Sequence, residues 1–115
     1  MSEADRGFRV TLNEALEGIS RAHPKRDATV FEHGSLEVEL YAPRGTDPQT
    51  PHKRDEVYII ARGSGMFRLA QTATPFGPGD FLFVPAGVEH RFDDFSDDFL
   101  TWVLFYGPEG GEKPR

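Results

Sequence analysis

The stretch GDFLFVPAGVEHRFDD, residues 79–94, decides the fold. It begins with a short apolar segment of the kind that forms strands, and a second such segment begins at His90. Pro85 and Gly87 lie between them and predict a tight turn. Because His90 begins the second strand, its imidazole can enter the interior of the protein. The stretch therefore predicts two short strands joined by a turn, with a histidine at the start of the second one.

The rest of the chain continues the pattern of short segments bounded by Gly, Pro or Asp. Five more strands are predicted: residues 28–33, 35–43, 52–62, 66–71 and 99–106. The second of these alternates Leu36, Val38 and Leu40 with Glu37 and Glu39, which is the period of a half-buried strand. No helical segment separates the strands, so crossover helices and a parallel sheet are excluded. An all-β fold follows, either a sandwich or a closed barrel.

The N-terminal residues 1–27 form an arm before the strands. Thr11 stands three residues before Glu14, the spacing of a capping box, and the apolar residues that follow recur near helical period. A short helix over residues 12–20 is predicted, and a loosely ordered arm is the alternative because short helices are marginal alone. We expect the barrel to span residues 28–107 and a flexible tail to follow over residues 108–115.

Composition excludes several classes of function. The 115 residues suit one domain, and the absence of cysteine excludes disulfide frameworks, thiolate nucleophiles and Cys-based zinc sites. The net charge is -6, and the 13 Lys and Arg residues form no long basic run, so no nucleic-acid partner is expected. No apolar stretch is long enough to span a membrane, and the first residues lack a signal-peptide core. We therefore expect a cytoplasmic protein without a membrane partner.

Three polar side chains are candidates for a metal site. His52 and Glu56 are four residues apart, so on a strand both point to the same face, which Tyr58 shares. His90 can reach the same interior from a neighbouring strand. Two imidazoles and one carboxylate form a facial triad, which is typical of non-haem iron and compatible with manganese, nickel or zinc. His23 and His33 are interpreted as ordinary histidines without a metal.

These residues resemble the motifs of the cupin family. Glu56 and Gly63 match the end of the first cupin motif, and His52 occupies the place of its second His. The second motif is matched at every spacing by Gly79, Pro85, Gly87 and His90. The resemblance covers roughly residues 35 to 106. It implies a cupin-type double-stranded β-helix, or jelly-roll barrel, that binds one divalent metal ion (Fe, Mn, Ni or Zn).

The chain departs from the cupin pattern at two positions. Thr50 stands where the family has its first His, and Asp94 stands where Asn is usual. The resemblance then implies a three-ligand site of His52, Glu56 and His90, with Gln49, Thr50 or water completing the shell. Such a site keeps open coordination positions, as catalytic metal sites do. A cupin with no metal in its barrel is the alternative.

Three kinds of function fit this sequence. The first is a metal-dependent dioxygenase acting on a small molecule. The second is a metal-dependent sugar isomerase or epimerase, and the third is a non-catalytic ligand-binding or sensor barrel. Arg54 and Tyr58 share the inward parity and are candidate substrate contacts, whereas no catalytic residue is identified.

Two segments, residues 57–60 and 99–106, are apolar on both faces. One face of each would lie outside the barrel, so the N-terminal helix or a second subunit should cover it. Since similar cupins usually pair through this sheet, we expect a homodimer. Phe83, Phe92 and Trp102 are expected in the core.

Overall fold

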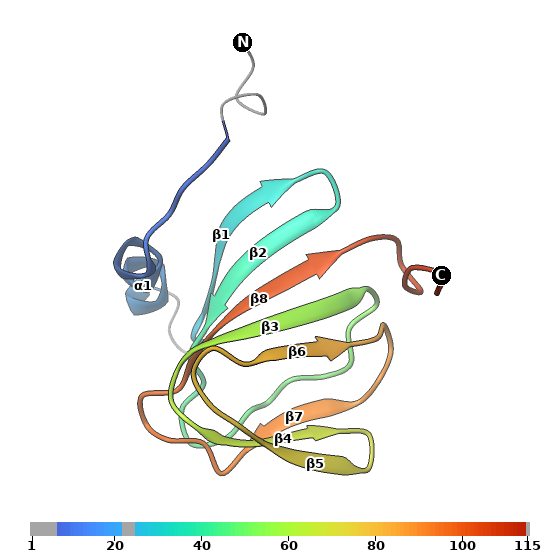
Figure 1. Cartoon of the computed structure of the whole chain (residues 1–115). Coiled ribbons are helices and arrows are strands. Elements are labelled where there is room, and N and C mark those ends of the chain that lie inside the picture. The colour runs from blue at the N-terminus through green and yellow to red at the C-terminus, as the bar shows by residue number, and fades with distance from the viewer. Residues whose placement is uncertain (1–6, 22–24, 115) are drawn as a thin grey trace.

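The computed structural model describes residues 7–21 and 25–114 (Figure 1). One helix precedes eight strands in the described part of the chain. The bounds are α1 Leu12–Arg21, β1 Asp27–His33, β2 Leu36–Tyr41, β3 Asp55–Arg62, β4 Gly65–Leu69, β5 Thr72–Phe76, β6 Phe81–Val84, β7 His90–Asp93 and β8 Leu100–Tyr106.

The strands form two antiparallel sheets. Five strands make one sheet in the order β1-β2-β8-β3-β6, and three make the other in the order β5-β4-β7. In Figure 1 the small sheet lies below the large one. The all-β barrel predicted from the sequence is confirmed. The sequence reading missed β5, whose Pro75 and polar residues are tolerated because β5 is an edge strand.

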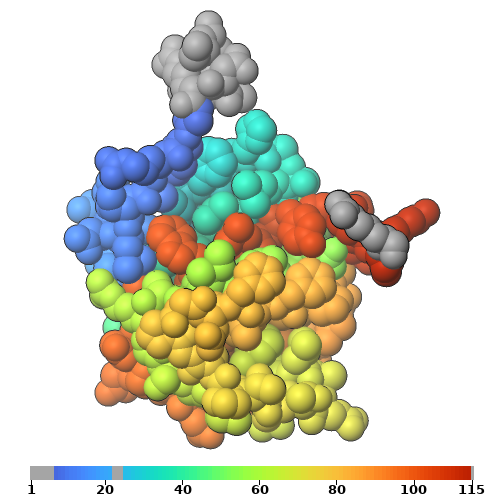
Figure 2. Space-filling model, viewed as in Figure 1, coloured from blue at the N-terminus to red at the C-terminus, as the bar shows by residue number. Residues whose placement is uncertain are grey.

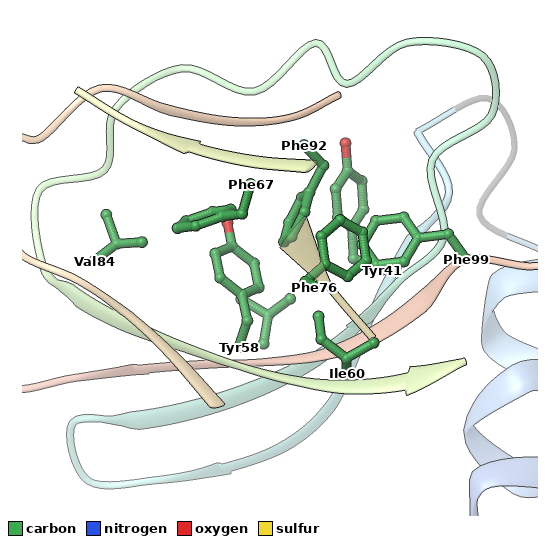
Figure 3. Close-up of a cluster of buried hydrophobic side chains, with 9 residues drawn as sticks. Tyr41, Tyr58, Ile60, Phe67, Phe76, Val84, Phe92 and Phe99 are labelled. Atoms are coloured by element: carbon green, nitrogen blue, oxygen red, sulfur yellow. The ribbon is translucent and has the colours of Figure 1, made fainter. Parts of the chain in front are cut away.

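Aromatic side chains from both sheets fill the space between them (Figure 3). Phe92 is 1 % exposed, and its ring centroid lies 4.8 Å from that of Tyr58 and 4.7 Å from that of Phe99. Phe67 and Phe76 add further contacts at 5.1 and 5.3 Å. Offset and edge-to-face arrangements at these separations are favourable for aromatic rings. This cluster holds the two sheets together.

Helix α1 packs on the outer side of the large sheet. Its buried Ala15 and Ile19 contact Leu40, Ala42 and Leu100. The helix begins as the capping-box spacing predicts, because Thr11 Oγ1 accepts a hydrogen bond from the Glu14 amide at 3.1 Å and donates one to Glu14 Oε1 at 3.0 Å. The predicted helix is confirmed, and it covers part of the apolar outer face.

Strand β2 places its carboxylates inside the barrel. Leu40 lies on the outer face beneath α1, whereas Tyr41 belongs to the aromatic cluster between the sheets. By the period of two, Glu37 and Glu39 share the inner face with Tyr41. The apolar face of β2 is therefore buried by the helix, and its acidic face is turned to the interior.

The outer face beyond α1 stays exposed. Ile59 is 39 % exposed, Phe81 64 % and Phe83 42 %. The expectation that Phe83 lies in the core is wrong: it pairs with Val57 in register, on the side of the sheet opposite to Tyr58. Phe92 is in the core as expected, and Trp102 packs against the cluster beneath α1. Figure 2 shows side chains of β6, in light orange, on the surface turned to the viewer.

The segment after β8 contacts the barrel. The Gly110 amide donates to the Lys53 carbonyl at 2.8 Å, and the Glu112 amide donates to Asp55 Oδ2 at 2.8 Å. Asp55 Oδ1 accepts from the Ala86 amide. One buried carboxylate thus ties the C-terminal segment to the turn between β6 and β7. Among the described residues, no helix is long and apolar enough to cross a membrane.

Candidate metal centre

Three parts of the fold bring His52, Glu56 and His90 together. Glu56 is the second residue of β3 in the large sheet, and His90 is the first residue of β7 in the small one. His52 lies in the loop before β3. One side-chain ligand atom from each lies within 4.8 Å of the other two. His90 Nε2 is 3.1 Å from Glu56 Oε1, and His52 Nε2 is 3.9 Å from Glu56 Oε2.

The position of His52 corrects one expectation. The predicted strand from residue 52 is too long, since β3 begins at Asp55. The backbone carbonyl of His52 instead accepts a hydrogen bond from the Gly87 amide at 2.7 Å, and its ring lies edge-on to Phe105 with centroids 4.9 Å apart. The turn of the second motif therefore positions the ligand of the first.

The charge balance of the site calls for a cation. Glu56 is fully buried, and among the described residues only the imidazoles of His52 and His90 face its carboxylate oxygens as charge partners. His90 Nδ1 lies 3.0 Å from the Val88 carbonyl, which can only accept, so Nδ1 carries a proton and Nε2 faces Glu56. Burial by itself would lower the pKa of His90, but the adjacent Glu56, the Val88 carbonyl and Asp47 raise it. Either a proton or a metal ion between Nε2 and the carboxylate satisfies both groups.

The donor set fits a divalent metal ion. Two imidazole nitrogens and one carboxylate are suitable ligands for a first-row metal ion, and the hydrogen bond from His90 Nδ1 to a backbone carbonyl is the usual way to orient a ligating histidine. A buried carboxylate would be costly if nothing compensated its charge.

Gln49 lies beside this centre, next to Thr50, which stands where cupins have their first ligating His. Its Oε1 is 3.3 Å from His52 Nε2 and accepts a hydrogen bond from the Tyr58 hydroxyl at 2.9 Å. The Tyr58 oxygen is also 3.1 Å from His90 Nε2. Tyr58 is fully buried, and burial together with the charge of Glu56 raises the pKa of its phenol. Tyr58 thus contacts Gln49 and His90 as a neutral phenol.

Sequence reasoning missed Asp47, which anchors the loop that carries His52. Asp47 is 3 % exposed and accepts hydrogen bonds from the Tyr41 hydroxyl at 2.6 Å and the Phe92 amide at 2.9 Å. The Gln49 side-chain amide donates to it at 2.9 Å. In the sequence Asp47 is one more turn residue in a loop rich in Pro and Thr, so no local signal distinguishes it.

Arg54, a predicted substrate contact, is already engaged elsewhere. Its Nη2 lies 3.1 Å from Glu37 Oε2, and Nη1 donates to the Ser35 carbonyl. The guanidinium carbon stands 5.9 Å from the centroid of the Phe105 ring. Arg54 lines a second cavity together with His52 and Phe105, so its role as a substrate contact stays a prediction. His33 is exposed at the end of β1, and His23 lies outside the described residues.

A cavity of about 320 Å³ opens beside the centre. Its lining combines ligands, carboxylates and apolar walls: Lys25, Asp27, Glu39, Tyr41, Pro48, Gln49, Thr50, His52, Glu56, Val103 and Phe105. Burial raises the pKa of Glu39 to about 8, and its hydrogen bond to Glu37 and the charges of Asp27, Glu37 and Glu56 add to the effect. Sequence reasoning missed Glu39, because the alternation of β2 does not reveal which face is inside.

The family comparison matches the cupin domain over residues 37–106. An uncharacterized protein of Streptomyces coelicolor is 38% identical over 77 residues, which cover 65% of this chain and 73% of that protein. An acireductone dioxygenase of Leishmania infantum is 38% identical over 79 residues, but these cover 55% of this chain and only 23% of the relative.

A solved structure supports the fold independently of sequence. Protein NMB1881 from Neisseria meningitidis superposes with a TM-score of 0.68 and 15% identity, covering 87% of this chain and 100% of that one. The matched region, residues 37–106, includes both segments that carry His52, Glu56 and His90. On the fold, the motifs and the family match together, this chain belongs to the cupin domain family.

Proposed function

We propose that this protein is a metal-dependent dioxygenase that acts on a small molecule with oxygen atoms on neighbouring carbons. The observation that carries the proposal is the buried Glu56 carboxylate, whose oxygens lie 3.1 Å from His90 Nε2 and 3.9 Å from His52 Nε2 at the side of a cavity. Three protein ligands leave coordination positions open, as catalytic metal centres require. A divalent ion held there would polarise substrate oxygens and, if redox-active, support oxygen chemistry.

The residues of the chain shape the place where a substrate binds. Val103 and Phe105 supply an apolar wall, while Gln49 and Thr50 supply polar groups next to His52. The volume of about 320 Å³ admits a small molecule and is at the low end for ligand cavities. Among the residues that the structure describes, no arginine lines this cavity, and the opposite charges of Lys25 and the acidic side chains partly balance. The site is therefore suited to a small, weakly charged compound.

The name of one relative supports this choice. The Leishmania infantum protein is an acireductone dioxygenase, and its 38% identity over 79 residues exceeds what the fold alone requires. Because the match covers only 23% of that relative, its substrate is not transferred to this chain.

A second candidate function is a metal-dependent isomerase or epimerase. It is favoured by Glu39, a carboxyl group in the same cavity with a pKa raised to about 8, mainly by burial. Proton transfer near neutral pH needs such a group.

Oxygen uptake tests the proposal. Protein prepared without metal is loaded anaerobically with Fe²⁺, Mn²⁺, Ni²⁺ or Zn²⁺, and oxygen consumption is followed with enediols, 1,2-diketones and catechols. We expect uptake with at least one redox-active metal and none in the His90→Ala variant. If the metal binds at one equivalent and no compound supports uptake, the dioxygenase proposal fails.

A further inference from the structure

We propose that Glu39 is the proton-transfer residue of the cavity, exchanging a proton with the carbon next to a carbonyl group of the bound substrate. This inference rests on the proposed metal site and names the reactive class of its substrate: a neutral carbonyl compound with a neighbouring hydroxyl or carbonyl oxygen.

The register of the large sheet places Glu39 two strands away from Glu56, on the same inner face. Glu39 pairs with Val103 in β8, and Val103 pairs with Tyr58 in β3. One step along the same face, Glu37 pairs with Phe105, which pairs with Glu56. Residues in register on neighbouring strands point to the same side, and two strand spacings amount to about 10 Å. A small molecule between β2 and β3 can therefore contact Glu39 at one end and the ligands at the other.

The two carboxyl groups of β2 have different partners. Glu37 forms an ion pair with Arg54, whose Nη2 lies 3.1 Å from Glu37 Oε2. No such ion pair involves Glu39 in the described parts of the chain. Burial and the neighbouring carboxylates raise the pKa of Glu39 to about 8, so Glu39 can hold a proton near neutral pH.

The groups that face Glu39 come from every element around it. Lys25 lies in the turn before β1, and Asp27 is the first residue of β1. Glu37 is on β2, Glu56 is on β3, and His52 lies in the loop before β3. Strand β8 contributes only apolar side chains to this part of the cavity, namely Val103 and Phe105. The carboxylates raise the pKa of Glu39 in addition to burial, so both of its protonation states are accessible near neutral pH.

The step is a simple proton exchange. In its ionised form Glu39 takes H⁺ from the carbon next to the carbonyl. The electron pair of that C–H bond becomes the C=C bond of an enolate, and the π pair of the carbonyl moves to its oxygen. In its protonated form Glu39 returns H⁺ to carbon, and the electron pairs move back. No oxidant or reductant is consumed.

Hydrogen–deuterium exchange of hydroxyacetone in D₂O tests the role of Glu39. Zn²⁺-loaded protein is used because zinc is diamagnetic and redox-inert, and the loss of the carbon-bound proton signals is followed by ¹H NMR. We expect the wild-type protein to accelerate exchange and Glu39→Gln to lower the rate on the order of 100-fold. Glu32→Gln is the matched control, because Glu32 is an exposed carboxylate on β1 outside the cavity. Equal rates in wild type and Glu39→Gln, whether fast or slow, overturn the proposal.

A second measurement does not depend on the loaded protein. ¹³C NMR titration of glutamate side-chain carboxyls in the metal-free protein should show one group titrating near pH 8, and this group should be missing in Glu39→Gln. Titration of Glu39 at the ordinary value for glutamate also overturns the proposal. Zinc content measured on the same samples separates the two ideas: absence of bound zinc in the wild type defeats the proposed metal site, whereas bound zinc with equal exchange rates defeats only the role of Glu39.

Discussion

His90 connects the metal centre to the second sheet, because its Nε2 faces Glu56 while its Nδ1 donates to the Val88 carbonyl. Replacing His90 with Ala should abolish metal binding, since Glu56 and His52 alone form a weak two-ligand site. The barrel should stay folded because its stability comes from the aromatic cluster. Elemental analysis should give about one equivalent of metal for the wild type and less than about 0.1 for the variant.

His33→Ala is the matched control for this experiment. His33 is exposed at the end of β1, so its loss should leave metal content unchanged. Unchanged metal content in both His90→Ala and His52→Ala would mean that the proposed centre does not exist.

Metal binding should depend on pH. The pKa of His90 is raised above its ordinary 6.5, since Glu56, Val88 and Asp47 outweigh the effect of burial. A metal ion must displace the proton from His90 Nε2. The affinity for the metal should therefore fall as the pH is lowered through the raised pKa of His90, and protons should be released on binding. Calorimetry in buffers of different ionisation enthalpy measures that release. Affinity that is constant between pH 8 and 5.5 would contradict the proposed coordination by histidine.

Glu39 should make the metal-free protein less stable in alkaline solution. Its pKa is raised from 4.5 to about 8, mainly by burial, so between these values the folded state holds a proton that the unfolded state has lost. The free energy of unfolding therefore falls as the pH rises from 4.5 to 8. Glu39→Gln removes this loss and should be more stable than wild type by about 1–2 kcal/mol at pH 9, after allowing for solvent screening of a partly exposed group. Thermal unfolding at pH 5 and pH 9 tests it, and an equal effect at both values would contradict the titration.

The three candidate ligands could be predicted from the sequence, because they occupy fixed positions within the two cupin motifs. It could not identify Asp47 or Glu39, whose positions depend on a loop conformation and on which face of β2 turns inward. It also could not show that Arg54 pairs with Glu37, because Glu37 is on β2 and strand β8 lies between β2 and β3 in the large sheet. Such pairings exist only after the strands are in register.

Helix α1 stabilises the sheet from outside, and Ile19 is its most buried residue at 3 % exposure. Ile19→Ala should destabilise the protein by about 2–4 kcal/mol, because it removes methyl groups packed against Leu40 and Leu100 and leaves a cavity. Urea unfolding measures this cost, and exposed Glu17→Ala is a control on the same helix. Metal content should not change, since α1 lies on the opposite side of the sheet from the ligands. A cost below about 0.5 kcal/mol would mean that the helix does not contribute to the fold.

Most secondary-structure elements were predictable, and the exceptions have physical causes. The strand predicted from residue 52 begins at Asp55, because the His52 carbonyl is bonded to Gly87 instead of a neighbouring strand. β5 has too few apolar residues to be recognised, and pairing with β4 alone is enough to form it. Gly63 illustrates a requirement that motif matching does capture: its φ is +86°, and a Cβ there would lie 2.6 Å from Phe99 Cα.

The outer face of the large sheet has an exposed apolar area that α1 does not cover. Ile59, Phe81 and Phe83 gather on the outer face of β3 and β6. We predict a homodimer through this face, because exposed aromatic side chains in one patch are typical of interfaces. Light scattering should give twice the chain mass of 12.9 kDa at tens of micromolar.

Phe81→Arg should shift the dimer to monomer, since Phe81 is 64 % exposed in the single chain and an unpaired charge would be buried on association. An equivalent change at exposed Arg68→Glu, on the small sheet, should leave the mass unchanged. A wild-type protein that is monomeric throughout would refute this interface.

The inward carboxylates of β2 also have a consequence for how such a protein can evolve. The stability of the fold comes from the phenylalanines packed between the two sheets, whereas Glu39, Thr50 and Gln49 line the cavity and bury little apolar surface. Substitutions at the cavity can therefore accumulate with little effect on folding, while those at Phe92 or Phe99 cannot. A library randomised at the cavity positions should keep most of its members folded and vary in which small molecules they accept. The same scaffold can in this way change its substrate long before it changes its shape.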